Sequence, residues 1–360
     1  MSDDFDKHRA KEFLATMTGV LNGGALALMC SIGHRTGLFD TMASLPPTGS
    51  SGIAEAAGLQ ERYVREWLGA MVMGGIVDHD PEADTYHLPK EHAGLLTRAA
   101  GPLNMTTFAQ YVGLLGKVED EVVEAFRTGG GVPYDRYPDF HRVMAESSGQ
   151  RYDRTLLDQV VPLLPGGAAA LEAGLDVADV GCGSGRAVLK LAGAFPASRF
   201  TGFDIAEGAI EQARAHAAEH GLDNARFEIR DAAALDVAGE FDIVTSFDAV
   251  HDQAHPRAML RGIATALRPG GTYLCVEPKA SSHLPDNHDL PMGPLLYTVS
   301  TMHCMTVSLA YDGEGLGAAW GAQTATEYLE EAGFADVEVT GIRDDRSNTY
   351  FLARKPAVGV

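Results

Sequence analysis

The 360-residue sequence is poor in cysteine, in positive charge and in long apolar runs. Its four cysteines show neither CxxC nor metal-finger spacing, which argues against a disulfide framework or a zinc finger. The start of the chain is polar and mixed in charge, unlike a secretory signal. No stretch approaches the roughly 18 uninterrupted apolar residues of a membrane span. These absences predict a cytoplasmic protein with reduced thiols and no membrane partner.

The shortage of positive charge has the clearest functional meaning. Lysine and arginine together number 28 against 49 aspartates and glutamates, which gives a formal net charge of −21. Proteins that bind a nucleic-acid backbone normally present a basic patch, because the phosphates supply most of the non-specific attraction. We therefore expect no nucleic-acid partner and a small molecule as substrate.

The chain is long enough for two domains, and its residue patterns divide it into three segments. Residues 1–100 are compact and mostly helical, and residues 101–155 resemble a helical connector interrupted by glycines and prolines. Residues 156–360 alternate short apolar strands with helices from about Leu175 onward. This alternation predicts an α/β domain with a doubly wound, mostly parallel sheet.

The first segment has the pattern of a winged helix. Helical spacing over residues 18–45 and helices at 51–58 and 61–73 are followed by short strands at 76–79 and 85–88. Winged helices often bind DNA, but residues 1–100 hold 8 lysines and arginines against 13 acidic residues, and the turn between the strands is acidic. This charge balance favours an oligomerisation or substrate-lid module.

The most informative motif lies where the α/β segment begins. A predicted strand at 177–179 runs into Gly181-Cys-Gly-Ser-Gly185 and then a helix, a turn whose free N–H groups suit a nucleotide-like ligand. The third glycine comes one residue earlier than in the dinucleotide fingerprint G-x-G-x-x-G. Asp179, two residues before the first glycine, would attract an ammonium group and repel a pyrophosphate. A dehydrogenase is therefore disfavoured.

Further candidate residues follow the next predicted strands. Asp204 ends the strand 199–204, about twenty residues beyond the glycines, where a carboxylate can accept both ribose hydroxyls. Asp231 and Ala232 follow the strand 227–230 and are placed to meet an adenine amino group. Phe247 ends the strand 242–247 and is placed to pack on the ring. Each residue alone has an ordinary structural explanation, but the ordered set does not.

This set resembles class I S-adenosylmethionine-dependent methyltransferases over about residues 155–360. Arg268-Pro-Gly-Gly271, a strand at 273–277, a helix at 324–332 and closing strands at 337–340 and 349–353 are also typical of that family. The resemblance implies a Rossmann-like, seven-stranded sheet and S-adenosylmethionine as cofactor. The residues implied to hold the cofactor are Asp179, Gly181, Cys182, Gly183, Asp204, Ile205, Asp231, Ala232 and Phe247.

With its front segment, the whole chain resembles two-domain small-molecule O-methyltransferases, in which the winged helix usually mediates dimerisation. In those enzymes a His-Asp-Trp stretch supplies a general base, and His251-Asp252 matches its first two positions. Glu277 matches a carboxylate that steadies the imidazole. A neutral histidine can take the proton of an attacking hydroxyl. Gln253 replaces the tryptophan, however, and no second orienting carboxylate is identified.

Several alternatives remain open at this point. His251 has a structural explanation as a loop residue, and methyl transfer to nitrogen, carbon or sulfur needs no such base. A non-catalytic, ligand-responsive winged-helix regulator is the hypothesis from another class. His283, His288, His303 and Cys304 have no compact ligand spacing, so no metal is expected. The apolar stretch 284–320 is expected to cover the substrate, and the acceptor itself cannot be named from these residues.

Overall fold

The computed structural model describes residues 5–357, apart from the side chain of residue 141. These residues form two compact units, one up to Gly116 and one from Lys117 onward. The predicted boundaries at residues 100 and 155 stay a prediction, since the connector contributes to both units. Each unit is described by itself below.

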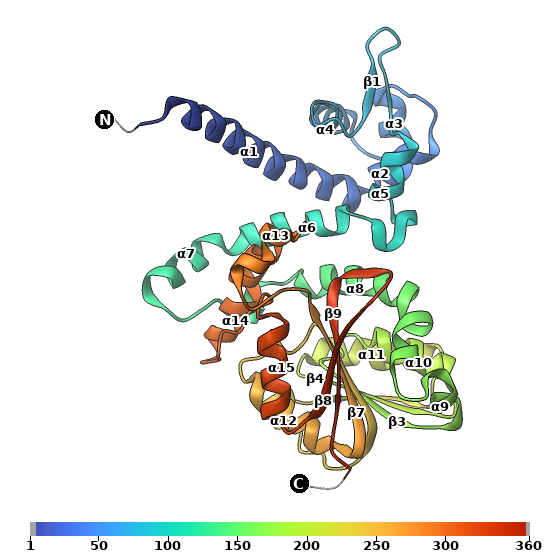
Figure 1. Cartoon of the computed structure of the whole chain (residues 1–360). Coiled ribbons are helices and arrows are strands. Elements are labelled where there is room, and N and C mark those ends of the chain that lie inside the picture. The colour runs from blue at the N-terminus through green and yellow to red at the C-terminus, as the bar shows by residue number, and fades with distance from the viewer. Residues whose placement is uncertain (1–4, 358–360) are drawn as a thin grey trace. The chain divides into compact units, whose positions relative to one another are not determined.

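The first unit is mostly helical with one small hairpin (Figure 1), as the winged-helix pattern predicts. Its elements are α1 (Lys7–Thr36), α2 (Leu38–Ser44), α3 (Ser50–Ala57), α4 (Glu61–Met73), β1 (Asp78–Asp80), β2 (Thr85–His87), α5 (Lys90–Leu96) and α6 (Thr106–Leu115). Phe39 and Trp67 meet edge to face in its core, with ring centroids 5.2 Å apart. The first strand starts two residues later than predicted, because Val77 is buried in that core.

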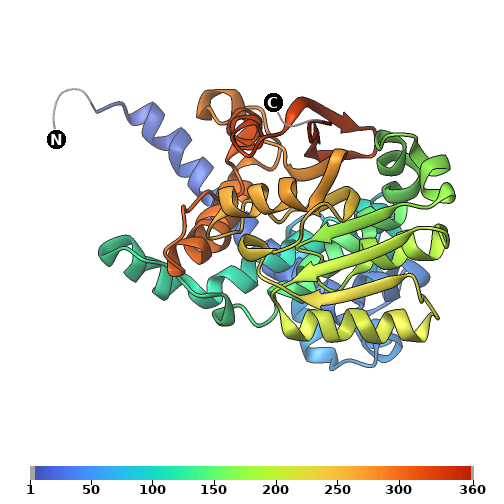
Figure 2. The same ribbon diagram turned by 90° about the horizontal axis from the view of Figure 1, so that it is seen from below.

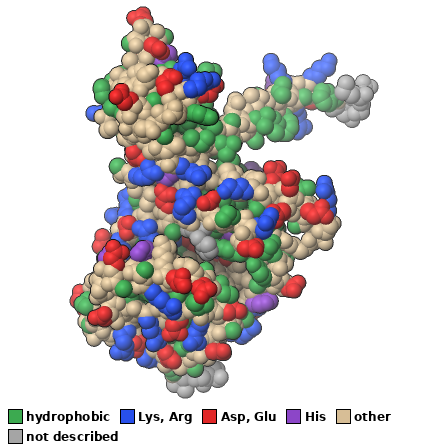
Figure 3. All heavy atoms as spheres, turned by 180° about the vertical axis from the view of Figure 1, so that it is seen from behind, with side chains coloured by type: hydrophobic (Ala, Val, Ile, Leu, Met, Phe, Trp, Pro, Cys, Tyr) green, Lys and Arg blue, Asp and Glu red, His purple; other side chains and the backbone are tan. Residues whose placement is uncertain are grey.

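The helix α1 begins at Lys7, five residues before Glu12, where the helical pattern of the sequence starts, and well before the apolar run from residue 18. Asp6 caps it, since its carboxylate accepts hydrogen bonds from the N–H groups of His8 and Arg9. Apolar side chains on this helix are exposed (Figure 3), including Phe13, Leu14 and Leu21 at 64%, 66% and 71%. By length and composition alone α1 is apolar enough to cross a membrane, a weak indication for one helix near a terminus.

The second unit is built on a seven-stranded sheet in the order β5-β4-β3-β6-β7-β9-β8. Its strands are β3 (Asp176–Val180), β4 (Arg199–Asp204), β5 (Ala225–Ile229), β6 (Phe241–Phe247), β7 (Leu267–Pro278), β8 (Ala335–Ile342) and β9 (Asp345–Arg354). The first five run parallel, and β9 pairs antiparallel with both β7 and β8. The predicted doubly wound sheet and its antiparallel closing pair are therefore confirmed.

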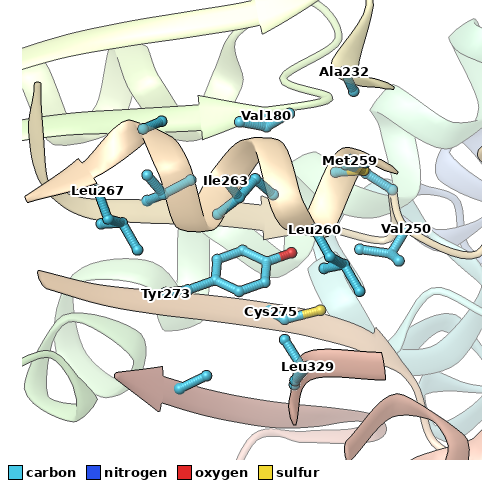
Figure 4. Close-up of a cluster of buried hydrophobic side chains, with 14 of the residues drawn as sticks. Val180, Ala232, Val250, Met259, Leu260, Ile263, Leu267, Tyr273, Cys275 and Leu329 are labelled. Carbon is cyan, nitrogen blue, oxygen red and sulfur yellow. The ribbon is translucent and has the colours of Figure 1, made fainter. Parts of the chain in front are cut away.

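Helices cover both faces of this sheet (Figure 2). The helices of the unit are α7 (Glu119–Thr128), α8 (Phe140–Thr155), α9 (Gly167–Ala173), α10 (Arg186–Ala194), α11 (Glu207–Glu219), α12 (Pro256–Ala266), α13 (Gly293–Val299), α14 (Met305–Ala310) and α15 (Gly321–Glu331). On one face α12 packs Met259, Leu260 and Ile263 against Tyr273 of β7 (Figure 4). On the other face α10 and α11 bury Leu191 and Ile210. Apolar burial on both faces is the main term that holds the sheet together.

The strand order also determines where a ligand is expected to bind. The chain leaves β3 toward β4 on one side and later returns to place β6 on the other side. In open α/β sheets, ligands bind at the carboxyl ends of the strands where the order reverses in this way. The segments that follow β3, β4, β5 and β6 carry the predicted cofactor residues, so the fold brings them to one edge.

Candidate active site

The loop after β3 requires its three glycines for different reasons. Gly181, Gly183 and Gly185 all have positive φ, at 78°, 53° and 75°. A Cβ at Gly181 would lie 2.6 Å from the Cβ of Ala249, and one at Gly185 would lie 2.4 Å from the Phe227 ring. A Cβ at Gly183 would meet nothing within 4 Å. The outer glycines let the loop pack on its neighbours, while the middle one leaves open space.

Asp204 ties this loop to the end of β4. One carboxylate oxygen accepts the N–H of Gly183 at 2.8 Å, and the other accepts the N–H of Ala206 at 2.9 Å. Ile205, the next residue, is 69% exposed. A carboxylate held beside an open loop and followed by an exposed aliphatic group offers hydrogen-bond acceptors and an apolar face at the same edge.

The remaining predicted cofactor residues surround the same loop. Cys182 packs under it, since a Cβ on Gly202 would lie 2.7 Å from its Sγ. Asp231 caps a short turn by accepting the N–H of Ala233 at 2.8 Å, and Ala232 is buried. The Phe247 ring contacts the Tyr152 ring of α8 edge to face, with centroids 5.2 Å apart. Cofactor contacts of these residues stay predictions.

Asp179 is the buried acid of this edge. Its side chain is almost fully enclosed, and the Thr245 hydroxyl donates a hydrogen bond to it at 2.7 Å. The pKa of Asp179 is raised to about 7, mainly by burial. The hydrogen bond from Thr245 acts to lower this pKa, and the charge of nearby Asp204 acts to raise it. A carboxylate in this state gains most from a neighbouring cation, and the ammonium contact of Asp179 stays a prediction.

His251 lies beyond β6 and is held by Glu277 of β7. Its Nδ1 is 2.5 Å from Glu277 Oε2, and both side chains are buried. The other Glu277 oxygen accepts the N–H of Val250 at 3.0 Å. Burial alone would lower the pKa of His251, but the charges of Glu277 and Asp252 raise it well above its usual value. The predicted pair is therefore brought together, with Nδ1 engaged and Nε2 turned to the other side.

Trp320 is a member of this group that the sequence did not identify. Its indole N–H donates to Glu277 Oε2 at 3.1 Å, from the residue just before α15. Trp320 thus gives Glu277 a donor in addition to His251 and the N–H of Val250, whereas the second carboxylate missing from the sequence pattern is one that would orient the imidazole itself. No local pattern indicates this role, because 43 residues separate the two partners.

Two further side chains lie on the Nε2 side of His251. Asp252 Oδ1 is 3.3 Å from Nε2. Cys304 is buried at the end of the π-helical turn Ser300–Cys304, and burial raises its thiol pKa to about 12. A ring nitrogen of His251, a carboxylate oxygen of Asp252 and Cys304 Sγ all lie within 4.8 Å of one another. His303 stacks on Phe140 of α8.

Arg151 of α8 is the second unpredicted residue at this edge. Its guanidinium donates to Asp248 at 2.6 Å and lies 3.9 Å from Asp345 of β9. Asp248 follows Phe247 directly and has a φ of 53°. The Arg151 contact thus fixes an unusual backbone conformation at the end of β6 and holds α8 across the carboxyl edge.

Two surface hollows lie elsewhere on this unit. One of about 380 Å³ lies at the amino ends of the strands, around Asp176, Arg199 and Arg268, whose charges pair with one another. The other, of about 410 Å³, lies between α7 and Tyr297, Thr301 and Met302. Neither is lined by a residue predicted to hold the cofactor or to act as base, but the second includes residues of the stretch 284–320, which is predicted to cover the substrate.

Comparisons with known proteins support this description of the two units. Residues 24–98 match the family model of the Rv2258c-like winged HTH domain, and residues 171–333 match the model of a methyltransferase domain. The human N-acetylserotonin methyltransferase has a similar structure, with a TM-score of 0.70 and 17% identity over 99% of this chain and 100% of that one. The mitomycin 7-O-methyltransferase MmcR gives a TM-score of 0.71 at 18% identity over 97% and 100%.

Curated relatives match only part of the chain. The ubiquinone biosynthesis O-methyltransferase of Stutzerimonas stutzeri is 35% identical over 28% of this chain and 42% of its own length. The protein of the same name from Ruegeria pomeroyi is 38% identical over 29% and 41%. The chain thus spans about two fifths of the length of these relatives. The chain thus combines a winged-helix domain with a methyltransferase domain, and as a whole it has the fold of solved methyltransferases.

Proposed function

We propose that the protein transfers a methyl group from S-adenosylmethionine to a hydroxyl oxygen of a small, partly apolar molecule, with His251 as general base. The observation that carries this proposal is the buried contact between His251 Nδ1 and Glu277. It fixes the tautomer and leaves Nε2 as the atom that accepts a proton. Ala249, two residues earlier, contacts Gly181, so this segment adjoins the cofactor loop.

The residues at the carboxyl edge fit the cofactor. S-Adenosylmethionine supplies an electrophilic methyl group on a sulfonium when it is bound. Asp179 would meet its ammonium group, and Asp204 would accept hydrogen bonds from the ribose hydroxyls. Phe247, Ile205, Asp231 and Ala232 would surround the adenine. The buried Asp179 carboxylate and the open space beside Gly183 both support this fit.

The pair of His251 and Glu277 takes up the proton that the acceptor hydroxyl loses. As the hydroxyl oxygen attacks, its proton moves to Nε2 of His251, and Glu277 stabilises the resulting imidazolium. Trp320 keeps Glu277 in place, and Asp252 stabilises the cation from the Nε2 side. The rings of Tyr137, Phe140 and His303 pack together as a buried aromatic cluster next to Asp252. The names of several similar proteins include O-methyltransferase, which favours oxygen as the acceptor atom.

Two measurements test cofactor binding and the role of the general base separately. S-Adenosylmethionine and S-adenosylhomocysteine should each raise the melting temperature of the wild type, and a panel of phenols should yield S-adenosylhomocysteine as product. His251→Ala should bind both compounds like the wild type and turn over roughly 10²–10⁴-fold more slowly. Failure of both compounds to shift the melting temperature overturns the proposal. Normal turnover by His251→Ala would remove only the base and would favour transfer to nitrogen, carbon or sulfur.

A ligand-responsive regulator is the second candidate, because residues 24–98 match a winged helix-turn-helix model. Its exposed face combines Arg62 and Arg65 with Glu61 and Glu66, and each arginine pairs with one of these acids. Charges neutralised in this way give little attraction for phosphate. A regulator would retard a DNA fragment at low salt, whereas the enzyme should not.

We further propose a homodimer that works in the cytoplasm. The apolar residues of α1 are exposed from Phe13 to Leu21, and a second copy of the same helix would cover them through a two-fold interface. The four unpaired cysteines support a reducing compartment. Light scattering should give twice the chain mass, and Leu14→Asp together with Leu21→Asp should give the monomer. A monomeric wild type would contradict the dimer.

A further inference from the structure

The Nε2 side of His251 carries a group of metal-binding side chains. A ring nitrogen of His251, one Asp252 carboxylate oxygen and Cys304 Sγ lie within 4.8 Å of one another, and Nε2 is the ring nitrogen that faces Asp252. Their residues come from the segment after β6 and from the turn Ser300–Cys304. We propose that these three atoms bind a Zn²⁺ ion, and that the bound ion blocks methyl transfer. The inhibition rests on the proposed role of His251 as base, whereas the zinc site itself does not.

The donor set suits zinc better than magnesium or calcium. An imidazole nitrogen, a carboxylate oxygen and a thiolate sulfur are the three ligand types of protein zinc sites, at about 2.0–2.3 Å from the metal. Tetrahedral geometry at these lengths places the donors about 3.3–3.8 Å apart. The Nε2 to Asp252 Oδ1 distance is already 3.3 Å, and the other separations are at most 4.8 Å. A soft thiolate disfavours the hard cations, which prefer oxygen.

The surroundings of His251 match a metal ligand as well as a base. Metal-binding histidines usually donate their other ring N–H to a carboxylate, which fixes the tautomer and strengthens the ligand. Glu277 accepts that hydrogen bond from Nδ1, and Trp320 in turn holds Glu277. Nε2 is thereby presented to Asp252 and Cys304. The arrangement of ligand and supporting carboxylate is complete without rearrangement of the strands.

Asp252 gives an independent indication. Its Oδ1 atom is buried and, among the described residues, makes no hydrogen bond of good geometry, although His251 Nε2 lies 3.3 Å away. A buried carboxylate oxygen held only by such a charge contact would be better satisfied by a bound cation. Asp252 and a Cys304 thiolate together carry two negative charges, which balance Zn²⁺. His303 Nδ1 lies 4.0 Å from the same oxygen and is the nearest candidate for a fourth ligand.

Binding is a ligand exchange without oxidation or reduction. The Cys304 thiol releases its proton to solvent, and its sulfur lone pair forms the bond to zinc. The lone pair on Nε2 forms another such bond, so it can no longer accept a proton from a hydroxyl group. Zinc-loaded protein should therefore bind S-adenosylmethionine normally and fail to transfer methyl. This proposal departs from the expectation, drawn from sequence spacing alone, that the chain holds no metal.

Equilibrium dialysis of the full chain against Zn²⁺, with Co²⁺ as an optical probe, tests the site. We expect one tightly held ion per chain and a near-ultraviolet band from cobalt bound to a thiolate. Cys304→Ser should abolish the band, and Asp252→Asn should weaken zinc binding. Glu277→Gln should lower zinc affinity roughly 10–100-fold through His251. Cys30→Ser, in the other unit, is the matched control and should bind like the wild type.

The melting shift with S-adenosylhomocysteine shows whether each variant is folded. Absence of a tightly bound ion in the wild type, or equal binding by folded Cys304→Ser, overturns the zinc site. Either result leaves the proposed methyl transfer intact, since that is measured without metal. In the phenol assay, one equivalent of zinc should stop turnover and a chelator should restore it. Full activity of zinc-loaded protein would overturn the inhibition.

Discussion

The proposed cofactor edge and the proposed base pocket of this protein are built by different means. After β3 and β4, backbone geometry and short-range contacts form the site: three glycines with positive φ, and a strand-end aspartate that binds the loop N–H. After β6 and β7, the site is a chain of side chains from distant segments, His251, Glu277 and Trp320. The first kind of site can be recognised from short motifs of consecutive residues. The second depends on the folded sheet to bring its members together.

The largest expected effect breaks the base pocket while leaving the cofactor edge intact. Glu277→Gln should reduce turnover roughly 10²–10⁴-fold, because the imidazole loses both its tautomer control and its counter-charge. Since Glu277 raises the pKa of His251, the wild-type rate should rise with pH above the usual imidazole range. In the variant this rise should shift to lower pH. The measurement is a pH–rate profile.

The exposed Glu207 of α11 provides a control for this variant. Glu207→Gln changes the same charge on the same unit, and its profile should match the wild type. A wild-type profile that stays flat between pH 6 and 9 would argue against a histidine base of raised pKa.

A second pair of variants tests the packing of the cofactor loop. Gly185→Ala places a Cβ against the Phe227 ring at positive φ, whereas Gly183→Ala has positive φ but open space. Backbone strain costs about 1–2 kcal/mol in each, and overpacking adds about 1–3 kcal/mol only at Gly185. Urea denaturation should show the larger loss of unfolding free energy for Gly185→Ala. Equal losses would mean that the ring does not restrict this position.

The contact between Trp320 and Glu277 is expected to have an intermediate effect. Trp320→Phe keeps an aromatic ring and removes the N–H donor, and hydrogen bonds to charged groups contribute about 1.5–3 kcal/mol. Turnover should fall roughly 10–100-fold, with unchanged affinity for S-adenosylmethionine. The second tryptophan gives the control, because Trp67→Phe removes a donor to a backbone oxygen in the other unit. If Trp320→Phe lowers the affinity for S-adenosylmethionine and leaves turnover unchanged, Trp320 acts on the cofactor edge and not on the base pocket.

The smallest effect concerns the pH dependence of cofactor binding. The raised pKa of Asp179, about 7, means that the free protein holds a proton there at lower pH. Binding of an ammonium group requires the carboxylate, so affinity should fall below pH 7 by up to tenfold per pH unit. Calorimetry in buffers of different ionisation enthalpy should detect proton release on binding. Asp179→Asn should bind weakly at all pH values, and a pH-independent wild type would contradict the ammonium contact.

The same contrast explains which parts could be predicted from sequence. The strand Arg199–Asp204 and the helix Glu61–Met73 match their predicted bounds because clear apolar patterns end at turn residues. The strand β7 begins at Leu267, before the predicted start at 273, because Leu267 pairs with Phe241 although a proline and two glycines follow it. Trp320, Cys304 and Arg151 reach the site through tertiary packing, which leaves no local pattern.

We propose that one edge of the sheet holds the cofactor and that a separate pair, His251 and Glu277, performs the proton transfer. The most direct test measures two quantities on one variant, His251→Ala: its dissociation constant for S-adenosylmethionine and its rate of S-adenosylhomocysteine formation with an accepted phenol. We predict a wild-type dissociation constant and a rate roughly 10²–10⁴-fold lower. A wild-type rate, or a parallel loss of cofactor binding, would contradict the division of the site.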